Sequence, residues 1–549
     1  MAMLLLAPAF WPNLLWNYHF TSMLELCTGL GFCLMSRGPQ STRSYLALAA
    51  IASPSIIILL LGEVPAKSEL TIWLLTLVSL WLIATSTRTW AHELLTSPKF
   101  SALFAIVITI FCIHALTQHY SLEPTSQNLF PFFYSQPGLN GPLSGIFNQP
   151  NLFGLMLALG ILVCWHQGHC SHQNIWYALA ILPLACLMLT GSKSSWLATC
   201  IAMLGHVIIT KSFNWKAFAL CLGAALTLEA YIQSTLQISS AVSLARIDSP
   251  VSYGIRLVMW LSCFELLKDH WLLGIGMGNY QAYAITAQAS AIAHWPFLAA
   301  FSANTSGVWV HNWLLEWLVC NGVFGFAAFA GLVLWPVLKR LAKISSQHQA
   351  EFALPATMLV AITIHGLTSA SVMLELLFPV LAALCVAALF PTSNSTKKTN
   401  NRYSQMLALI LIATSAITAV TWLVQSASIE KAYMLPASSD EYRDIMNQSF
   451  QSPLVERQAY EWFMFRLWKT HPPAQVWGKA YPVALKLWQL QQSQLALKYL
   501  ILITHIRKNT PEERQWIRVY VKAWPHDKTS TFLKNHIEPE HQESQTLQL

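Results

Sequence analysis

Residues 149–166 read QPNLFGLMLALGILVCWH, a stretch without Asp, Glu, Lys or Arg. The hydrocarbon core of a bilayer is about 30 Å thick, and roughly 20 apolar helical residues cross it. The stretch is close to this length, so we predict a helix that spans a membrane. The whole chain has the same character, because 55% of its 549 residues are hydrophobic and only 10% are charged. A soluble domain carries about 25% charged residues, and the composition therefore predicts an integral membrane protein.

Similar apolar runs follow one another along most of the chain and are separated by polar loops. We interpret them as about 13 transmembrane helices of an all-α polytopic membrane protein. The first run lacks a basic leader and a small-residue cleavage site, so we do not expect a removable signal peptide. The predicted spans are 2–15, 20–36, 44–62, 70–87, 100–118, 149–166, 174–190, 195–210, 216–234, 310–336, 353–369, 373–390 and 404–425.

Lysine and arginine are unevenly distributed over the loops. Loops rich in these residues normally face the cytoplasm, whereas short outer loops carry few of them. We therefore place the N-terminus in the cytoplasm, and the long segments 119–148 and 235–309 in the periplasm of a bacterial inner-membrane protein. This distribution also argues against nucleic acid as a partner, because the net charge of +8 is not gathered in one basic groove. The basic loops carry Arg37, Arg43, Arg88, Lys99, Lys211, Lys216, Lys339, Arg340, Lys343, Lys397, Lys398 and Arg402.

The composition changes near residue 427, where charged and polar residues become frequent. We assign residues 1–426 to a transmembrane domain and residues 427–549 to a periplasmic helical domain, whose apolar residues recur at three- and four-residue spacing. In the long outer loop, RLVMWLSCFELLK at 256–268 predicts an amphipathic helix at the membrane surface. GIGMGNY at 274–280 follows no predicted strand, so we predict a tight turn and not a dinucleotide site.

Three basic or titratable residues lie where the predicted outer loops meet the bilayer: Lys193 in GSKSSW, Arg256 in YGIRLVMW and His311 in VWVHNWLLEW. Each alone is typical of a lipid headgroup anchor or an interfacial side chain. Together, two cations can neutralise a pyrophosphate while a neutral imidazole accepts a proton from a hydroxyl. The trio predicts transfer of a group from a lipid-linked diphosphate to an alcohol. No acidic cluster is present in the outer segments, so we expect no metal ion and no cofactor.

Five further residues are candidates for supporting roles. Asn312 either orients His311 or caps the helix that follows. Gln149 and Asn151 either cap the helix that begins at Pro150 or line the donor site. His365 and Glu375 flank an outer turn, where we expect either a structural pair or a contact to the acceptor.

Four segments of the chain resemble, in the same order, motifs of the bacterial O-antigen ligase superfamily, Wzy_C. They are FNQPNLFG (147–154), TGSKSSWLA (190–198), YGIRLVMWLSCFELLKDHWLLGIGMGNY (253–280) and VHNWLLEWLVCNGVFG (310–325). The resemblance implies a large outer loop and an inverting glycosyl transfer from lipid-diphosphate-linked donors, without metal or nucleotide. It also implies that His311 is the essential histidine and Arg256 the outer-loop arginine. The family's other cation is usually Arg, and Lys193 keeps the charge without the bidentate geometry.

The soluble tail and the stretch NYHFTSMLELCTGLGF (17–32) resemble the protein O-oligosaccharyltransferases of this superfamily, which are PglL-like. This implies transfer of an oligosaccharide from undecaprenyl pyrophosphate to Ser or Thr of a pilin or another periplasmic protein, within membrane lipid. Lipopolysaccharide O-antigen ligases and O-antigen polymerases share this chemistry and stay open as alternatives. A membrane transporter is an alternative from another class, although we find no related halves in the chain. A non-enzymatic scaffold would leave the three outer residues unexplained.

Overall fold

The computed structural model describes most of the chain, and all regular secondary structure in the described residues is helical. The described ranges are 42–61, 65–120, 149–236, 250–302, 309–347, 349–369, 377–391, 402–436, 439–452, 454–470 and 474–527, with Cys27, Leu30, Leu143, Phe147, Thr529, Ser530 and Leu533.

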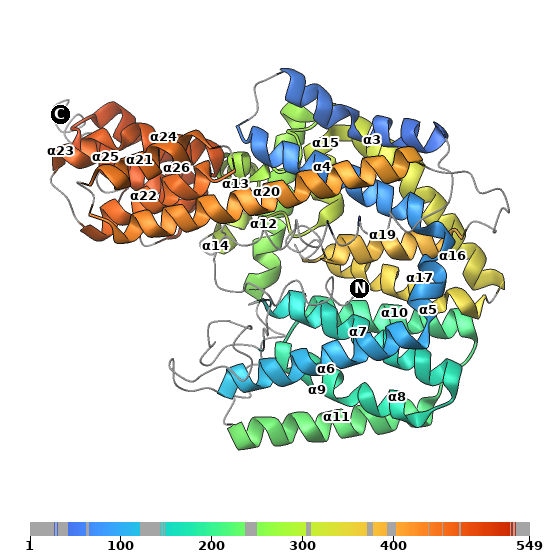
Figure 1. Cartoon of the computed structure of the whole chain (residues 1–549). Coiled ribbons are helices and arrows are strands. Elements are labelled where there is room, and N and C mark those ends of the chain that lie inside the picture. The colour runs from blue at the N-terminus through green and yellow to red at the C-terminus, as the bar shows by residue number, and fades with distance from the viewer. Residues whose placement is uncertain are drawn as a thin grey trace. The chain divides into compact units, whose positions relative to one another are not determined.

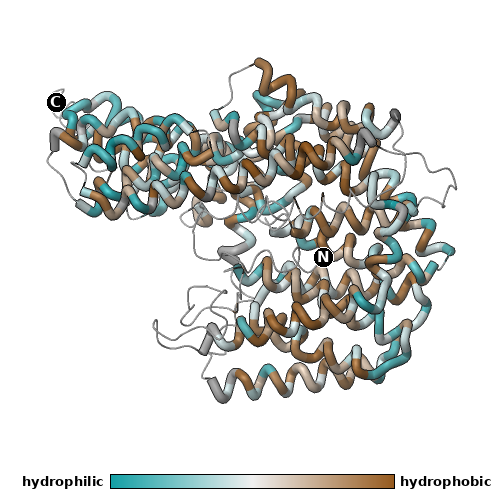
Figure 2. Tube along the Cα trace, viewed as in Figure 1, coloured by the Kyte–Doolittle hydropathy of each residue, from teal (hydrophilic) through white to brown (hydrophobic). Residues whose placement is uncertain are grey.

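Eight helices among the described residues are long and apolar enough to cross a membrane, which confirms the all-α polytopic prediction. The count of 13 stays a prediction, and the runs 2–15 and 20–36 lie outside the described residues apart from Cys27 and Leu30. Figure 2 shows hydrophobic residues along most of these helices. The eight are α3 (Thr42–Leu61), α4 (Lys67–Ser86), α6 (Pro98–Tyr120), α7 (Pro150–Ser171), α10 (Lys193–Thr210), α11 (Trp215–Leu236), the continuous run Trp313–Gln347 and α20 (Arg402–Met434).

Three predicted spans correspond to shorter apolar helices in the described residues, which leave out 370–376. The run 174–190 forms two helices, α8 (Asn174–Leu179) and α9 (Ile181–Thr190), which meet at Ala180. The runs 353–369 and 373–390 form α17 (Ala353–Gly366) and α19 (Leu377–Leu389). These helices are as apolar as the longer ones, so the hydrophobicity was predicted better than the length of each helix.

The chain divides into two compact units, each made of segments that are distant in sequence. The first unit contains residues 1–50, 75–249 and 328–420. Its central helix is α7, in which every residue from Leu152 to Gly168 is buried. Helices α6, α9, α10 and α17 pack around it. Gly154 allows the closest of these approaches, because a Cβ atom there would collide with the side chain of Ser195 on α10.

The second unit contains residues 51–74, 250–327 and 421–549. Helix α12 (Pro250–His270) confirms the helix predicted at 256–268 and begins six residues earlier. A turn then leads to α13 (Tyr280–His294). The turn places Gly274, Gly276 and Gly278 at φ values of 78°, 85° and 78°, which favour glycine and confirm the predicted tight turn.

The glycine turn at 274–278 forms backbone hydrogen bonds with α15 (Trp313–Phe329), the helix that follows His311, where this helix is interrupted. Gly322 leaves the helical conformation at φ 63° and ψ −175°. Two carbonyl groups of α15 therefore accept from the turn instead: Val319 O from Ile275 N at 3.0 Å and Cys320 O from Gly276 N at 2.8 Å. The freed N–H groups of Val323 and Phe324 donate back to Trp271 O at 2.7 Å and Leu272 O at 3.3 Å. The backbone groups released by the break are thus satisfied by the segment that ends α12.

The C-terminal helices gather in one bundle of the second unit, shown in orange and red in Figure 1. Helix α13 joins its core, where Ile285 packs with Tyr499, Tyr520 and Trp524. The predicted boundary at residue 427 falls inside α20 and stays a prediction. The bundle contains α21 (Asp440–Gln451), α22 (Glu456–Thr470), α23 (Ala474–Lys479), α24 (Tyr481–Leu490), α25 (Gln494–Ile506) and α26 (Thr510–Ala523).

Hydrogen bonds of the Gln492 and Gln288 side chains connect α13 to the bundle. Gln492 Oε1 accepts from the backbone N–H groups of Ile285 and Thr286 at 3.0 and 2.9 Å, and from the Thr286 hydroxyl at 3.2 Å. Gln288 Nε2 donates to the carbonyl oxygen of Ala523 at 2.7 Å. The bundle and the segment 250–294, which carries Arg256, are parts of one unit.

Candidate functional site

His311 lies directly before α15 in a backbone conformation that is uncommon for a residue with a side chain. Its φ is 57°, in the left-handed region. The next residue, Asn312, caps the helix, because its Oδ1 accepts from the N–H groups of Leu314 and Leu315 at 3.1 Å each. Of the two roles predicted for Asn312, the structure thus shows the helix cap.

Helix α12 brings two side chains to the segment that carries His311. Arg256 and Trp260 are four residues apart, so they share one face of the helix. The indole Nε1 of Trp260 donates to the carbonyl oxygen of Val310 at 3.1 Å. The guanidinium of Arg256 lies 6.0 Å from the ring centre of Tyr253, one turn earlier, and acts on the charge state of His311.

The electrostatics of this site favour a neutral imidazole. Burial, and then the positive charge of Arg256, lower the pKa of His311 from its ordinary value to about 4. At neutral pH the ring is therefore uncharged and has a nitrogen that can accept a proton. Its Nδ1 atom is buried and has no hydrogen-bond partner among the described residues. Burial also lowers the pKa of Arg256, but a guanidinium keeps its charge at any physiological pH.

Lys193 is the first residue of α10 in the first unit. Ser192 caps this helix, and its hydroxyl oxygen accepts from the N–H of Ser195 at 3.3 Å. The positive end of a helix dipole disfavours a cation but favours an anion. The positive end of the α10 dipole and the ammonium of Lys193 therefore both attract negative charge at this place.

A buried hydrogen-bond network surrounds the turn that carries Lys193. The hydroxyl of Ser192 donates to Asn151 Oδ1 at 2.8 Å and contacts the hydroxyl of Ser195 at 2.7 Å. His365 Nε2 lies 3.2 Å from the hydroxyl of Ser194 and 3.1 Å from that of Ser195. Asn151 and His365, which are more than 200 residues apart in the sequence, thus support the same turn.

Of the two roles predicted for Gln149 and Asn151, the cap of α7 is not observed, and the lining of the donor site stays a prediction. Gln149 occupies the capping position of α7, but its side chain makes no capping hydrogen bond. Glutamine has one methylene more than asparagine, and the preferred caps are the shorter side chains of Ser, Thr, Asp and Asn. Its Oε1 atom is buried without a hydrogen-bond partner among the described residues. Asn151 does not cap the helix at Pro150 either, because its side chain bonds to Ser192.

Residues 178–330 match the family model Wzy_C, which is described as O-Antigen ligase. This confirms the resemblance to the O-antigen ligase superfamily. The matched O-antigen ligase region contains Lys193, Arg256, His311 and Asn312. No curated protein and no solved structure gives a match.

The match supports an O-antigen ligase-type enzyme that transfers a glycan. This class implies a glycosyltransferase-type ligase activity with a lipid-linked oligosaccharide as donor and a separate acceptor. The apolar helices of the structure agree with a membrane protein of this class. Among the described residues, no group of three or more His, Cys, Asp or Glu side chains is arranged to hold a metal ion.

The structure brings the predicted residues together in two groups. His311, Asn312 and Arg256 belong to the second unit, whereas Lys193, Asn151 and His365 belong to the first. Glu375, the predicted companion of His365, lies outside the described residues.

Sequence reasoning missed Trp260 and the serines around Lys193. The position of Trp260 four residues after Arg256 was a signal that the two share a helix face. The serines of GSKSSW had a signal too, since small hydroxyl residues at a helix start commonly form caps and local hydrogen bonds.

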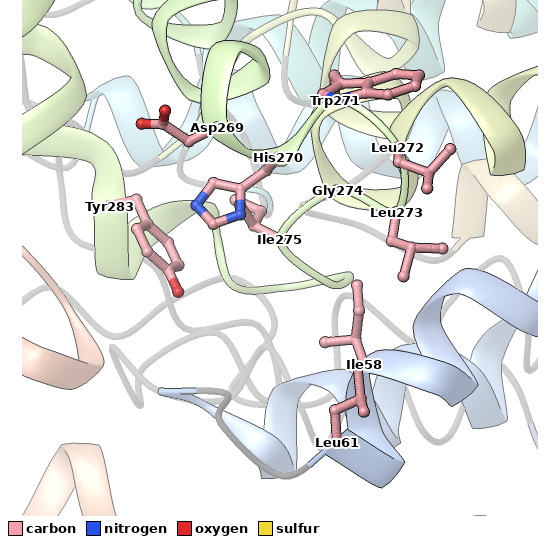
Figure 3. Close-up of a pocket in the computed structure, with 10 residues that line it drawn as sticks. All are labelled: Ile58, Leu61, Asp269, His270, Trp271, Leu272, Leu273, Gly274, Ile275 and Tyr283. Carbon is pink, nitrogen blue, oxygen red and sulfur yellow. The ribbon is translucent and has the colours of Figure 1, made fainter.

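A pocket of about 550 Å³ opens at the far end of α12. Figure 3 shows Asp269, His270 and Tyr283 on one side of it, and apolar side chains that include Leu273 and Ile58 on the other. About 20 Å of helix separates this end from Arg256, at 1.5 Å of rise per residue. The pocket is therefore distinct from the group around His311.

Proposed function

We propose that the protein is a protein O-oligosaccharyltransferase of the bacterial inner membrane. It moves an oligosaccharide as one block from undecaprenyl pyrophosphate to Ser or Thr of periplasmic proteins, including pilins. The observation that carries this proposal is the neutral imidazole of His311 beside Arg256 within the matched O-antigen ligase region. The helical bundle after residue 427 supports a protein acceptor, because the superfamily members that resemble this chain there glycosylate proteins.

The reaction assigns one role to each group of residues. Arg256 and Lys193 bind the pyrophosphate of the donor, with Arg256 forming paired hydrogen bonds and Lys193 acting as a point charge. His311 accepts the proton of the acceptor hydroxyl as the oxygen attacks the anomeric carbon from the side opposite the phosphate. The new C–O bond forms while the bond from the sugar to phosphate breaks, and the electron pair leaves with undecaprenyl pyrophosphate. The configuration at the anomeric carbon inverts, and His311 then releases its proton to solvent.

Donor binding also prepares His311 for its role. In the free enzyme the charge of Arg256 disfavours the protonated imidazole. A bound pyrophosphate offsets that charge, so the pKa of His311 rises toward its ordinary value and the ring becomes a stronger base. Proton transfer is most efficient when the pKa of the base is near the working pH. The base therefore gains strength when the donor is in place.

In this proposal the reacting groups face the periplasm, the N-terminus is cytoplasmic, and residues 427–549 form a periplasmic domain. This orientation rests on the uneven distribution of lysine and arginine between the loops. The donor is lipid-linked in this compartment, since the periplasm has no nucleotide-sugar supply. Residues 427–549 lie on the same side as the acceptor and provide a surface for it.

Intact-mass spectrometry of periplasmic and pilin proteins tests the proposal. Wild type, a deletion strain, and the deletion strain complemented with His311→Ala or with His294→Ala are compared; His294 is an exposed histidine of the same unit. We expect a glycan mass to be lost in the deletion and His311→Ala strains and kept with His294→Ala. Unchanged protein masses with loss of O-antigen from lipopolysaccharide would assign the ligase alternative, and shortened O-antigen chains would assign a polymerase. Transfer of glycan by the purified protein without a gradient would exclude a transporter.

A further inference from the structure

We propose that Glu316 and Trp260 are positioning residues that hold the Val310 peptide from two sides and thereby fix His311 in the site. The inference rests on the proposed function of His311 and adds two residues to it. The carbonyl oxygen of Val310 accepts from Trp260 Nε1 at 3.1 Å. The backbone N–H of the same residue donates to the side-chain carboxyl group of Glu316. Val310 itself is fully buried, so no water replaces these partners.

The conformation of His311 requires such support. A residue with a side chain persists in the left-handed region when its surroundings determine the backbone on both sides. After His311, the cap by Asn312 fixes the first turn of α15. Before His311, the contacts from Glu316 and Trp260 fix the peptide of Val310. The two restraints together hold the backbone of His311 at the observed φ of 57°.

Among the described residues, the backbone N–H of Val310 is the hydrogen-bond donor that contacts the Glu316 carboxyl group. It is 4% exposed, within a helix that is otherwise apolar for most of its length. A carboxyl group in such surroundings is costly unless it has hydrogen-bond partners. Its neighbours include Cys263 and Cys320, which are weak hydrogen-bond donors, and its Oε2 atom has no hydrogen-bond partner among the described residues. The bond to Val310 is therefore the contact that explains a carboxyl group at this position.

The same contacts set the spacing between Arg256 and His311. Arg256 lies one helical turn before Trp260, about 5.4 Å along α12. When Trp260 holds Val310, the guanidinium is placed beside the next residue of the loop, His311. Loss of either contact would let the loop move away from α12. His311 would then become more accessible and less influenced by the charge of Arg256.

Diethyl pyrocarbonate tests this inference without any glycan substrate, because it modifies neutral imidazoles. The purified full-length protein is treated in detergent, and peptide mass spectrometry gives the modification rate of each histidine between about pH 5.5 and 7.5, a range that brackets the ordinary pKa of histidine. We expect slow, pH-independent modification of wild-type His311, since its pKa is about 4. Glu316→Ala and Trp260→Phe should raise the rate at least fivefold and introduce a pH dependence. Glu316→Gln should behave as wild type, because its amide oxygen accepts the same N–H.

Matched controls separate positioning from general loosening. Glu265→Ala removes a carboxylate from α12 that pairs with Lys268, and Trp295→Phe removes an indole N–H elsewhere in the unit. Both should leave the modification of His311 unchanged. If His311 reacts at the wild-type rate in both Glu316→Ala and Trp260→Phe, or equally fast in the controls, the inference is wrong. Should Glu316→Ala fail to fold, Trp260→Phe and its control decide the matter alone.

Glycan transfer by membranes of the complemented deletion strain completes the test. We expect the initial rate to fall at least tenfold in Glu316→Ala and Trp260→Phe, and to be kept in Glu316→Gln. If His311 reactivity responds as expected but wild-type membranes transfer no glycan to protein, the positioning stands and the proposed function fails. If transfer occurs at an unchanged rate in both variants, the proposed function stands and the positioning fails.

Discussion

Arg256 on α12 helps to hold the imidazole of His311 in its neutral form, since burial of the ring and the positive charge of Arg256 both lower the pKa of this group. The relationship links the two residues that the proposed reaction assigns to the leaving group and to the attacking hydroxyl. The titration of His311 therefore reports the charge at position 256.

Arg256→Gln should therefore move the acid side of the pH profile. His311 must be neutral to accept a proton, so activity is lost as pH falls through its pKa, which is about 4 in the free wild-type enzyme. Removal of the Arg256 charge raises this pKa, while burial still keeps it below about 6.5. We expect the loss of activity to begin at a higher pH, measured as the transfer rate at limiting donor, together with a fall of about 100-fold at neutral pH from weaker binding of the leaving group. Arg256→Lys keeps the charge, and an acid limb that moves equally in this variant would contradict the explanation.

Lys193→Ala should lower the rate of transfer by about 100-fold, because the pyrophosphate loses one of its two cations. Lys193→Arg should keep or increase the rate, since it supplies the same charge with paired hydrogen bonds. Initial rates in membranes of complemented strains measure both effects. Lys268→Ala is the control, because Lys268 is an exposed partner of Glu265. Equal rates in Lys193→Ala and Lys268→Ala would remove Lys193 from the site.

Ser195→Ala should destabilise the first unit. The fully buried hydroxyl of Ser195 contacts Ser192 and His365, and its loss leaves buried polar groups with fewer partners. Such a loss costs about 1–3 kcal/mol, which thermal unfolding of the purified protein would detect as a lower midpoint. Ser234 on α11 is exposed, and Ser234→Ala should change the stability by less than about 0.5 kcal/mol. A midpoint that does not differ between these two variants would argue against a structural role of the network.

Gln492→Ala should loosen α13 from the C-terminal bundle. The variant removes the acceptor of three hydrogen bonds from Ile285 and Thr286, at a cost of about 1–3 kcal/mol. Hydrogen exchange should therefore become faster at 280–294 while α7 is unaffected. Gln489→Ala, on the exposed side of α24, should leave exchange in α13 as in wild type. Protection of α13 that survives in Gln492→Ala would show that apolar packing alone fastens it.

Apolar runs predicted the helices of this fold well, because a membrane-spanning helix requires length and hydrophobicity, and both are visible in the sequence. The runs that became α3, α4, α6, α10 and α11 begin and end within a few residues of the predicted positions. The division of the run 174–190 into α8 and α9 was missed, although Pro183 in the first turn of α9 marks it, since proline has no N–H to donate to the carbonyl of Leu179 at the end of α8. The spans predicted at 2–15 and 20–36 stay predictions.

The candidate site was predicted in part. Lys193, Arg256 and His311 could be chosen because charge is rare in an apolar chain. Trp260, Glu316 and the serines near Lys193 could not, since their roles depend on which segments meet in space. Gln149 shows the opposite error, where the residue at the capping position has a longer side chain than the preferred caps.

The break at Gly322 bears on the order in which the protein is assembled. The carbonyl groups of Val319 and Cys320 obtain their partners from residues 275 and 276, which the ribosome completes before α15. A helix entering a bilayer cannot leave backbone groups unsatisfied. Residues 275 and 276 are thus synthesised first, and they provide the hydrogen-bond donors that α15 needs to complete its fold. The corner that holds His311 becomes complete when these two parts of the nascent chain meet.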